Sequence, residues 1–408
     1  YKLGENITVT LTNIGNETIE IGGYPAWQIF TYSEEEPVYP EVFLYLLWWL
    51  EPGENDSITW NQLNGFTKSH VNPGSYVVRD LLGWGLFTYF KIVAAEIIVP
   101  DDYPTIQEAI NNANEEDTIY VRAGRYLEDI VVNKSVSLIG EDREVTKIYG
   151  NWIAIHVIVN STTISEFTVQ SVNYGILLNR SNFNIITSNI LTSGDVGYAI
   201  LLKNANHNCI TNNIIVRCPH TGIHIDSSSY NLIANNSIMY NEISGIIIVR
   251  SNYTIVRENE INHNKYGIDL IDSSGSIIFH NNFVNNAHQT LLGSQSHNNT
   301  WYNGCEGNYW SDYNGTDSDG DGVGDTPYVI DGNNTDHYPL MNPYWLPGDV
   351  NHDLKIDIYD VVRITGVYGS QQRDPNWNCH SDIAEPYGII NIYDVVTCTK
   401  DYRKEYTP

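Results

Sequence analysis

Apolar residues recur at nearly constant intervals through the middle of the chain. A small residue opens each interval, and successive spacings are 24, 23, 23 and 22 residues: Gly175, Ala199, Gly222, Gly245 and Gly267. Apolar residues follow one and three positions later, which places both on one face of a strand. A repeat of about 23 residues has room for three short strands and three turns. The pattern predicts a right-handed parallel β-helix of roughly seven or eight coils, each contacting only its neighbours.

Three columns of residues set the expected register of these coils. The two apolar columns are Ile176, Ile200, Ile223, Ile246 and Ile268, and Leu178, Leu202, Ile225, Ile248 and Leu270. The third is Asn189, Asn213, Asn236, Asn259 and Asn282. Stacked side-chain amides can hydrogen-bond from coil to coil, so these asparagines are expected to be structural. The residues between the two apolar columns should face outward: Leu177, Leu201, His224, Ile247 and Asp269.

The residues before the repeats have a different pattern. Residues 1–94 contain short alternating segments such as ITVTLT and GSYVVRD, broken by Pro-Gly pairs at 52–53 and 73–74. This predicts a β-sandwich, and the segments resemble immunoglobulin-like surface modules and the fold of some small proteinase inhibitors. From Ala95 a strand and a helix follow, with Thr105 and Glu108 forming a capping box at the start of the helix. We expect this helix to cover the open end of the solenoid.

Acidic residues are closely spaced in one loop after the repeats. Asp317, Asp319, Asp321 and Asp325 stand at positions 1, 3, 5 and 9 of this loop, with Gly322 at its turn. Four carboxylates so close together repel one another unless a cation neutralises them. The spacing predicts a calcium site.

The last 60 or so residues contain two similar stretches, each ending in IYDVV. The first has ligand-type residues at loop positions 1, 3, 5, 7, 9 and 12: Asp349, Asn351, Asp353, Lys355, Asp357 and Asp360, of which Lys355 would bind through its backbone carbonyl. Leu354 stands where a turn glycine is usual. The second loop is one residue longer and offers Asp382, Glu385, Asn391 and Asp394. We therefore expect two to three Ca²⁺ ions in the whole chain.

Charge and composition narrow the classes of protein. Of the 408 residues, 49 are Asp or Glu and 21 are Lys or Arg, a balance that disfavours nucleic acid and anionic membranes. The longest apolar run, from Val42 to Leu50, is far shorter than the roughly 20 residues of a membrane-spanning helix. We expect a mature chain that carries neither a targeting segment nor a membrane anchor.

Sequons and cysteines indicate an extracellular protein. The candidate glycosylation sites are Asn6, Asn16, Asn55, Asn133, Asn160, Asn179, Asn235, Asn252, Asn298, Asn314 and Asn333. Cys379 and Cys398 bracket one loop and could form a disulfide in an oxidising compartment. Cys209, Cys218 and Cys305 are expected to be buried thiols.

Catalytic chemistry on the solenoid would need carboxylates that converge with a base. The candidates are Asp226, Arg250, Asp269 and Asp272, and Arg250 and Asp272 should lie on neighbouring coils as a surface ion pair. The twelve histidines are scattered, without the paired spacing of a transition-metal site. The sequence therefore contains no clear catalytic cluster.

Two stretches resemble a known family: DYPTIQEAINNANEEDTIYVRAGRYLEDIVVNKSVSLIGED and GNYWSDYNGTDSDGDGVGDTPYVIDGNNTDHYPLM. Both are similar to the NosD-like β-helix repeat proteins, abundant among archaeal surface proteins, and the resemblance covers about residues 95–343. It implies the β-helix fold and an association with sugars. One branch of the family is described as periplasmic copper-binding, but no copper-type motif stands out in this sequence.

Residues 344–408 resemble a dockerin, a module of paired calcium loops and helices. In dockerins, the positions of Ile358 with Tyr359 and of Ile392 with Tyr393 recruit a cohesin-like partner domain. We expect a non-catalytic structural or adhesive protein, extracellular or on the cell surface, that assembles through its end domains into a filament or surface layer. Its partner would be a second copy or a cohesin-like protein, and surface polysaccharide is a further candidate. The alternative is a carbohydrate-binding or polysaccharide-degrading protein.

Overall fold

The computed structural model describes residues 96–400 and 402–403, apart from 195–196, 294, 345–347, 373, 375–376 and 385–388, together with the backbone of eight earlier strands and of Cys379. It divides into two units, residues 1–97 with 114–119, and residues 98–113 with 120–408. Each unit is described by itself. No helix among the described residues is both long enough and apolar enough to span a membrane.

The first unit contains antiparallel strands. β1 (Ile7–Thr12) pairs with β6 (Asn55–Trp60), and β2 (Ile19–Ile21) pairs with β5 (Trp48–Leu50). Four strands form a sheet in the order β4 (Pro37–Tyr39), β3 (Trp27–Thr31), β7 (Gly74–Asp80) and β8 (Phe87–Ile92). The packing of these sheets depends on side chains outside the described residues, so the immunoglobulin-like sandwich stays a prediction.

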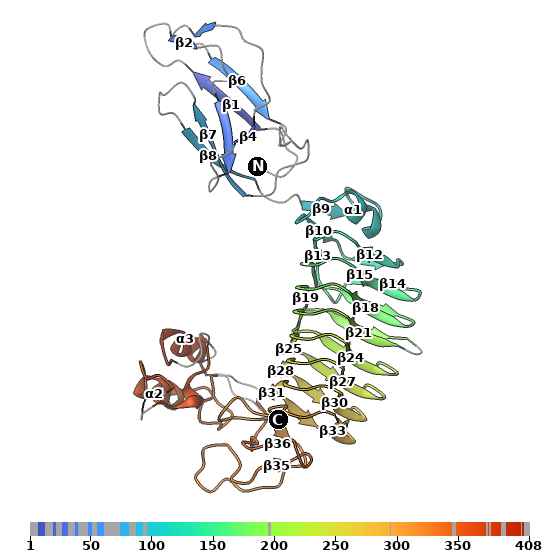
Figure 1. Ribbon diagram of the computed structural model, residues 1–408, viewed down its shortest axis with the longest axis vertical. Coiled ribbons are helices and arrows are strands. Elements are labelled where there is room, and N and C mark those ends of the chain that lie inside the picture. Colours follow the sequence, from blue (N-terminus) through green and yellow to red (C-terminus); the bar gives the residue numbers. More distant parts are fainter. Residues whose placement is uncertain are drawn as a thin grey trace. The chain divides into compact units, whose positions relative to one another are not determined.

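The second unit contains a parallel β-solenoid built from three sheets, with the coils stacked in chain order (Figure 1). The first sheet holds β9 (Glu96–Val99), β10 (Thr118–Val121), β13 (Ser137–Gly140), β16 (Thr163–Ser165), β19 (Ile185–Thr187), β22 (Cys209–Thr211), β25 (Leu232–Ala234), β28 (Ile255–Arg257) and β31 (Ile277–Phe279). The second holds β11 (Gly124–Tyr126), β14 (Thr146–Gly150), β17 (Thr168–Ser171), β20 (Ile190–Ser193), β23 (Ile214–Val216), β26 (Ser237–Met239), β29 (Glu260–Asn262), β32 (Asn282–Val284) and β34 (Tyr309–Trp310). The third holds β12 (Ile130–Val132), β15 (Ile153–Val157), β18 (Tyr174–Asn179), β21 (Tyr198–Lys203), β24 (Thr221–Asp226), β27 (Ser244–Val249), β30 (Tyr266–Ile271) and β33 (His288–Leu292).

The predicted parallel β-helix is confirmed, and its apolar columns have the predicted register. Ile176 pairs with Ile200, and Leu178 with Leu202; the later members continue both columns and are fully buried. With nine strands in two of the sheets, the solenoid has about nine coils rather than seven or eight. The additional coils come from β10 to β15, where coil lengths are too irregular to reveal a repeat.

The asparagine column is a hydrogen-bonded ladder, but its last predicted member is wrong. The Asn236 amide donates to Asn259 Oδ1 over 3.0 Å, and that of Asn259 donates to Asn281 Oδ1 over 2.9 Å. Asn281 continues the ladder instead of Asn282, because the coil after Asn259 is one residue shorter. Asn282 lies in β32 opposite Glu260.

A short helix precedes the first full coil of the solenoid. Helix α1 (Ile106–Asn112) begins at Thr105, whose hydroxyl accepts the Glu108 backbone N–H over 3.1 Å, which is one of the two hydrogen bonds of the predicted capping box. Glu128 accepts two more N–H groups at the helix start. Ile106 and Ile110 are completely buried, so this helix contributes to the core at that end.

After the last coil, the chain forms loops and a small helical module. β35 (Tyr328–Val329) pairs with β36 (Thr335–Asp336). Helices α2 (Ile358–Gly366) and α3 (Ile392–Lys400) follow (Figure 1). The 3-10 turn Cys379–Ser381 lies between them in the sequence. Val350, Ile356, Ile364, Ile390 and Cys398 form the buried core of this module.

Candidate functional site

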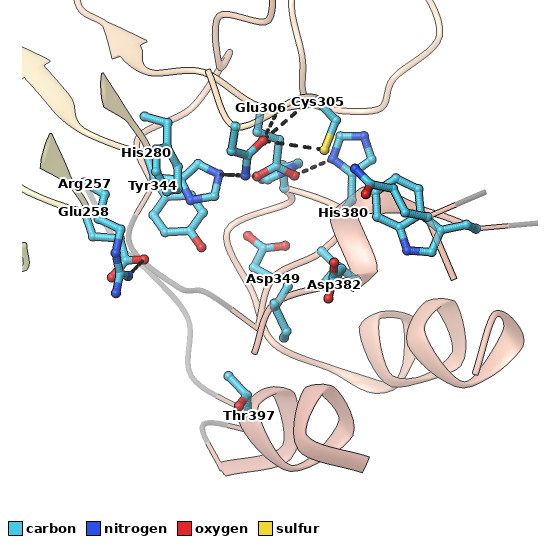
Figure 2. Close-up of a pocket in the computed structure, with 17 residues that line it drawn as sticks. Arg257, Glu258, His280, Cys305, Glu306, Tyr344, Asp349, His380, Asp382 and Thr397 are labelled. Atoms are coloured by element: carbon cyan, nitrogen blue, oxygen red, sulfur yellow. Dashed lines mark hydrogen bonds and ion pairs between the residues drawn. The ribbon is translucent and has the colours of Figure 1, made fainter. Parts of the chain in front are cut away.

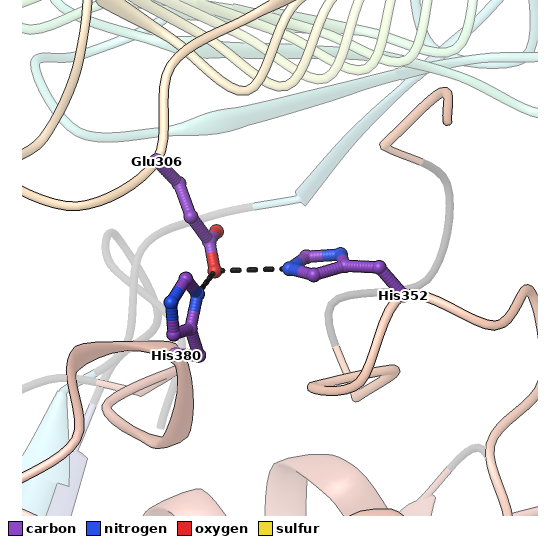
Figure 3. Close-up of side chains that lie close together, drawn as sticks. All are labelled: Glu306, His352 and His380. Carbon is purple, nitrogen blue, oxygen red and sulfur yellow. Dashed lines mark hydrogen bonds and ion pairs between the residues drawn. The ribbon is translucent and has the colours of Figure 1, made fainter. Parts of the chain in front are cut away.

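A cavity of about 450 Å³ lies where loops from the solenoid end meet the helical module (Figure 2). Glu306, from the loop between β33 and β34, lies at its wall. His352 from the first acidic loop of the module and His380 from the 3-10 turn point at the carboxylate of Glu306 (Figure 3). The His352 Nε2 to Glu306 Oε1 distance is 3.1 Å, and His380 Nδ1 contacts the same oxygen.

The environment of Glu306 favours its charged form. Burial alone would raise its pKa, but the neighbouring His352 and hydrogen bonds from three histidines outweigh burial, so the pKa lies well below its usual value. Burial would lower the pKa of His352, yet the attraction of Glu306 outweighs it and the pKa is raised. The site therefore combines a buried, charged carboxylate with imidazole groups that interact with it through hydrogen bonds and electrostatic attraction.

His280 of the solenoid and two loop residues, Asn303 and Tyr344, surround Glu306. His280, in the turn between β31 and β32, contacts the second carboxylate oxygen, Oε2, with its Nε2 at 2.6 Å. The Asn303 side chain accepts the Glu306 backbone N–H over 3.0 Å. Tyr344 stacks on the His280 ring with the centroids 3.9 Å apart. Both oxygens of the carboxylate are thus engaged by imidazole nitrogens.

The ligand atoms of Glu306, His352 and His380 all lie within 4.8 Å of one another. Imidazole nitrogen and carboxylate oxygen are donors that suit Zn²⁺ and Cu²⁺. Sequence reasoning treated these histidines as scattered, because they are separated from Glu306 by 46 and 74 positions. The fold brings these three side chains together, although their spacing in the sequence did not indicate a site.

The first predicted calcium loop is compact. Asp317, Asp319 and Asp321 offer ligand oxygens within 4.8 Å of one another. Asp317 also accepts the backbone N–H groups of Gly320 and Gly322. Asp325 is held separately, by the Ser318 hydroxyl at 2.7 Å. Calcium at this loop stays a prediction.

The second predicted calcium loop folds around its own carboxylates. Asp349 accepts backbone N–H groups from Asp353 and Leu354, and Asp353 accepts that of Lys355. At the end of the loop, Asp360 accepts three backbone N–H groups, those of Val350, Asn351 and Asp357. Asp357 caps helix α2. Leu354 has a φ of +69°, so the residue in the place of the usual glycine is strained.

The third predicted loop repeats this arrangement. Asp394 accepts the backbone N–H groups of Ile383, Ala384 and Asn391, just as Asp360 does with its three donors. Asp382 begins the loop and borders the cavity. Glu385 lies outside the described residues, so its predicted role is untested. The two halves of the module therefore share one hydrogen-bond pattern.

The helices that follow these loops expose matched apolar residues. On α2 they are Ile358, Tyr359 and Val362, and on α3 they are Ile392, Tyr393 and Val396. All six are between 53% and 67% exposed. The first, second and fifth residues of each helix thus form an uncovered apolar patch.

Two of the four catalytic candidates, Asp226 and Asp269, lie in strands of the third sheet, and Arg250 and Asp272 each follow such a strand directly. Arg250 forms its ion pair with Asp226, on the preceding coil, and not with Asp272. Asp269 is 3% exposed and accepts a hydrogen bond from Ser244 over 2.7 Å, and burial raises its pKa to about 6. Asp272 occupies a turn position with positive φ. The outward column is present in register, although stacking leaves Leu177, Leu201, Ile247 and Asp269 with little exposure.

The cysteine predictions need correction. Cys398 is a free, buried thiol whose Sγ lies 3.4 Å from the Gly348 carbonyl oxygen, so the Cys379–Cys398 disulfide is wrong. Cys305, expected as a thiol, is disulfide-bonded. Cys209 and Cys218 are free, as expected, although only Cys218 is fully buried.

Most of the described sequons lie at the surface. The exposed asparagines are Asn133, Asn160, Asn235, Asn298, Asn314 and Asn333, whereas Asn179 and Asn252 are half-buried. The side chains of Asn6, Asn16 and Asn55 lie outside the described residues. Glycosylation stays a prediction.

Comparison with known proteins identifies one family. The model of the family described as periplasmic copper-binding protein (NosD) matches residues 110–315. No curated protein matches the chain.

Solved structures that match share at most the fold with this chain. A PL6 family alginate lyase is 14% identical, with 50% of this chain and 38% of that chain covered and a TM-score of 0.37. The Agl-KA catalytic domain is 14% identical, covering 73% and 66%, with a TM-score of 0.39. Pectin methylesterase PemA from Erwinia chrysanthemi is 10% identical, covering 48% and 80%, with a TM-score of 0.35. The chain spans about two fifths of the alginate lyase, and scores this low carry no argument about activity.

The copper in the family description can be tested against the donors in this chain. Glu306, His352 and His380 fit copper by donor type. Only Glu306 falls within the matched residues 110–315, whereas both histidines come from the module beyond them. Any copper site at this cluster would therefore depend on residues outside the matched region.

Proposed function

Because this chain belongs to the NosD family of periplasmic copper-binding proteins, we propose that it acts outside the cytoplasm, as a non-catalytic structural scaffold. In this proposal its C-terminal module, with calcium bound, docks onto a second copy of the chain. The observation that carries the proposal is the pair of matched apolar patches on α2 and α3. The chain would assemble end to end into a filament or surface layer.

The apolar patches support docking because they are paired. Single exposed apolar side chains are ordinary on protein surfaces. Here the same three residue types, Ile, Tyr and Val, recur at the same helical positions and follow loops with the same hydrogen bonds. Tyrosine is also enriched in the buried centres of protein interfaces. A partner that covered one patch could cover the other in a related way.

Calcium would control docking through the loops that precede the helices. The module has a small core, and cores of this size commonly need metals or disulfides for stability. A cation at Asp349, Asp353 and Asp360 would offset the electrostatic repulsion among these three carboxylates. Loop ordering and helix position would then depend on the same ion.

Assembly through terminal modules suits a solenoid, because its coils bond to their neighbours in only one direction. Helix α1 contributes buried residues to the core near one end, and the buried Trp301 and Trp310 lie beside the last coil. A head-to-tail contact between different surfaces of two copies propagates as an open chain. In such a chain, one end of each copy would contact the opposite end of the next copy.

Sedimentation velocity of the full chain tests this proposal. With calcium, we expect species larger than the monomer at micromolar concentration, and the monomer alone after chelation. The double variant Tyr359→Asp, Tyr393→Asp should stay monomeric while binding the same number of calcium ions as the wild type. The control is Tyr240→Asp, which alters an exposed solenoid tyrosine and should assemble normally. A wild-type chain that remains monomeric with calcium would overturn self-docking and leave a cohesin-like domain as the occupant.

A second candidate function rests on Asp269. This carboxyl group is buried in the outward column of the third sheet with a raised pKa, which is a feature of some catalytic acids. The proposal would be polysaccharide binding or cleavage on that sheet. A depolymerisation screen on acidic polysaccharides tests it: cleavage by the wild type that disappears in Asp269→Ala would favour this function over the structural one.

A further inference from the structure

We propose that Glu306, His352 and His380 bind one divalent transition-metal ion, Zn²⁺ or Cu²⁺, which fastens the helical module to the end of the solenoid. This inference goes beyond the structural scaffold and does not depend on self-docking. It also differs from the predicted calcium sites, because two of its three donors are imidazole nitrogens. Figure 3 shows the three side chains converging from separate segments of the chain.

One pair of donor atoms already has the spacing of two ligands around one ion. Bonds of 2.0–2.1 Å in a tetrahedral site place neighbouring donors about 3.3 Å apart. The His352 Nε2 to Glu306 Oε1 distance of 3.1 Å is close to this value. The contact of His380 Nδ1 with the same oxygen is closer, and a small side-chain rotation would open it. Little rearrangement is needed to admit an ion.

The surroundings of Glu306 resemble the support of a metal ligand. In metal sites, a ligating carboxylate is commonly oriented by a further hydrogen bond. His280 Nε2 fills this role at 2.6 Å from Oε2, which leaves Oε1 for the ion. The stacked ring of Tyr344 fixes the His280 imidazole in turn. Glu306 itself is only 5% exposed, so its position is set by packing.

Space for a further ligand lies beside the three donors. The cavity of about 450 Å³ borders Glu306, His352 and His380. Three protein donors with an adjoining cavity leave a fourth position for water or a small anion. The ion would therefore have one ligand that can exchange with solvent.

The donor atoms of this site favour a different kind of metal ion from the acidic loops. Ca²⁺ takes six to eight oxygen ligands, which two imidazoles and one carboxylate do not supply. Zn²⁺ and Cu²⁺ bind imidazole nitrogen well. Calcium should therefore fill the aspartate loops without competing here, and both kinds of ion can be bound together.

An ion at this site would link three segments that are distant in sequence. His352 and His380 belong to the two halves of the module, and Glu306 precedes β34 of the solenoid. Gly322 packs against this arrangement, since a Cβ added there would lie 2.4 Å from the Cβ of His352. Cys305, next to Glu306, is already in a disulfide. The ion would therefore join both halves of the module to the loop that precedes β34.

Isothermal titration calorimetry tests the proposal on the full chain. The protein is stripped with a chelator, returned to calcium, and titrated with Zn²⁺ in one arm and Cu²⁺ in the other. We expect one tightly bound ion per chain, with Cu²⁺ bound more tightly than Zn²⁺. A chain that takes up neither ion would overturn the proposal and show that the cluster is a hydrogen-bonded ion pair network only.

Variants locate the bound ion. His352→Gln and His380→Gln should each weaken binding roughly 100-fold, with calcium stoichiometry retained as the check of folding. His297→Gln removes an exposed histidine elsewhere and should bind as the wild type does. Equal affinity in all three variants, or loss in His297→Gln alone, would overturn the assignment.

Electron paramagnetic resonance of the Cu²⁺-loaded wild type needs no variant. We expect hyperfine coupling to two imidazole nitrogens, since two histidines supply ligands in the proposed site. A spectrum without imidazole coupling would contradict the site even if a variant had failed to fold.

Discussion

Removing one asparagine of the ladder should strongly destabilise the solenoid. Asn236 is 2% exposed. Its amide donates to the carbonyl oxygens of Ile210 and Ala234 at 2.8 and 3.0 Å, and to Asn259 Oδ1 at 3.0 Å. Its Oδ1 accepts both the backbone and side-chain N–H groups of Asn213 at 3.0 Å. Asn236→Ala removes all five bonds.

The loss in the free energy of unfolding depends on which neighbouring groups keep a hydrogen-bond partner after the substitution. The Asn213 side chain keeps its bond to the Ile186 carbonyl, and Asn259 Oδ1 keeps the Asn236 backbone N–H. The Asn213 backbone N–H loses its acceptor within the core, which costs about 1–3 kcal/mol. Two or three further bonds contribute about 1 kcal/mol each. The free energy of unfolding should fall by about 4 kcal/mol in total.

Urea unfolding followed by far-ultraviolet circular dichroism, with calcium present, measures this change. The matched control is Asn235→Gly, at the adjacent exposed position with a φ of +57°, where glycine is unstrained. The control should shift the free energy of unfolding by no more than about 0.5 kcal/mol. A loss below about 1 kcal/mol in Asn236→Ala, or one equal to that of the control, would refute the view that the ladder holds the coils together.

Three other outcomes are expected. Leu354→Gly should raise the stability of the helical module by up to about 1 kcal/mol, because it relieves a φ of +69°; a lower melting temperature of the module would contradict this. Equilibrium dialysis should show one calcium ion fewer in Asp317→Ala than in the wild type, with no change in Asp129→Ala, which lies in the first coils. Burial raises the pKa of Asp269 to about 6, so the folded protein favours the protonated carboxyl group. The free energy of unfolding should therefore be highest below about pH 4 and should fall as the pH rises through 6. Asp269→Asn should remove this dependence, about 3 kcal/mol between pH 4 and 7, in urea unfolding; equal pH profiles would exclude it.

The solenoid was predictable because each coil must place apolar side chains at the same points along the stack. That requirement repeats Ile176 and Leu178 at intervals long enough to count. The error at Asn282 arose because a column can change its interval by one residue when a turn shortens. In the structure, the Asn259 side chain donates its hydrogen bond to Asn281, and the spacing alone does not reveal this choice of partner.

The histidine and glutamate cluster could not be predicted from spacing. His280 belongs to a solenoid turn, Glu306 to a loop after the last regular coil, and His352 and His380 to the two halves of the module. Such a site depends on how the module packs against loops, and no periodic pattern encodes that packing. The disulfide at Cys305 was missed for the same reason, since proximity in sequence favoured Cys379 with Cys398.

The acidic loops could be predicted in part, less fully than the solenoid but better than the histidine and glutamate cluster. Asp349 through Asp360 form a local motif, so their order in the chain determines most of their geometry. The sequence also identified the strained position at Leu354.

Electron microscopy of the full chain tests the central proposal of calcium-dependent assembly most directly. The protein is imaged with calcium, after chelation, and after calcium is restored, beside the double variant Tyr359→Asp, Tyr393→Asp. The proposal predicts filaments or sheets that dissolve on chelation, return with calcium and are absent in the variant. Single separate molecules in the wild type with calcium, or polymers that persist in the variant, would contradict it.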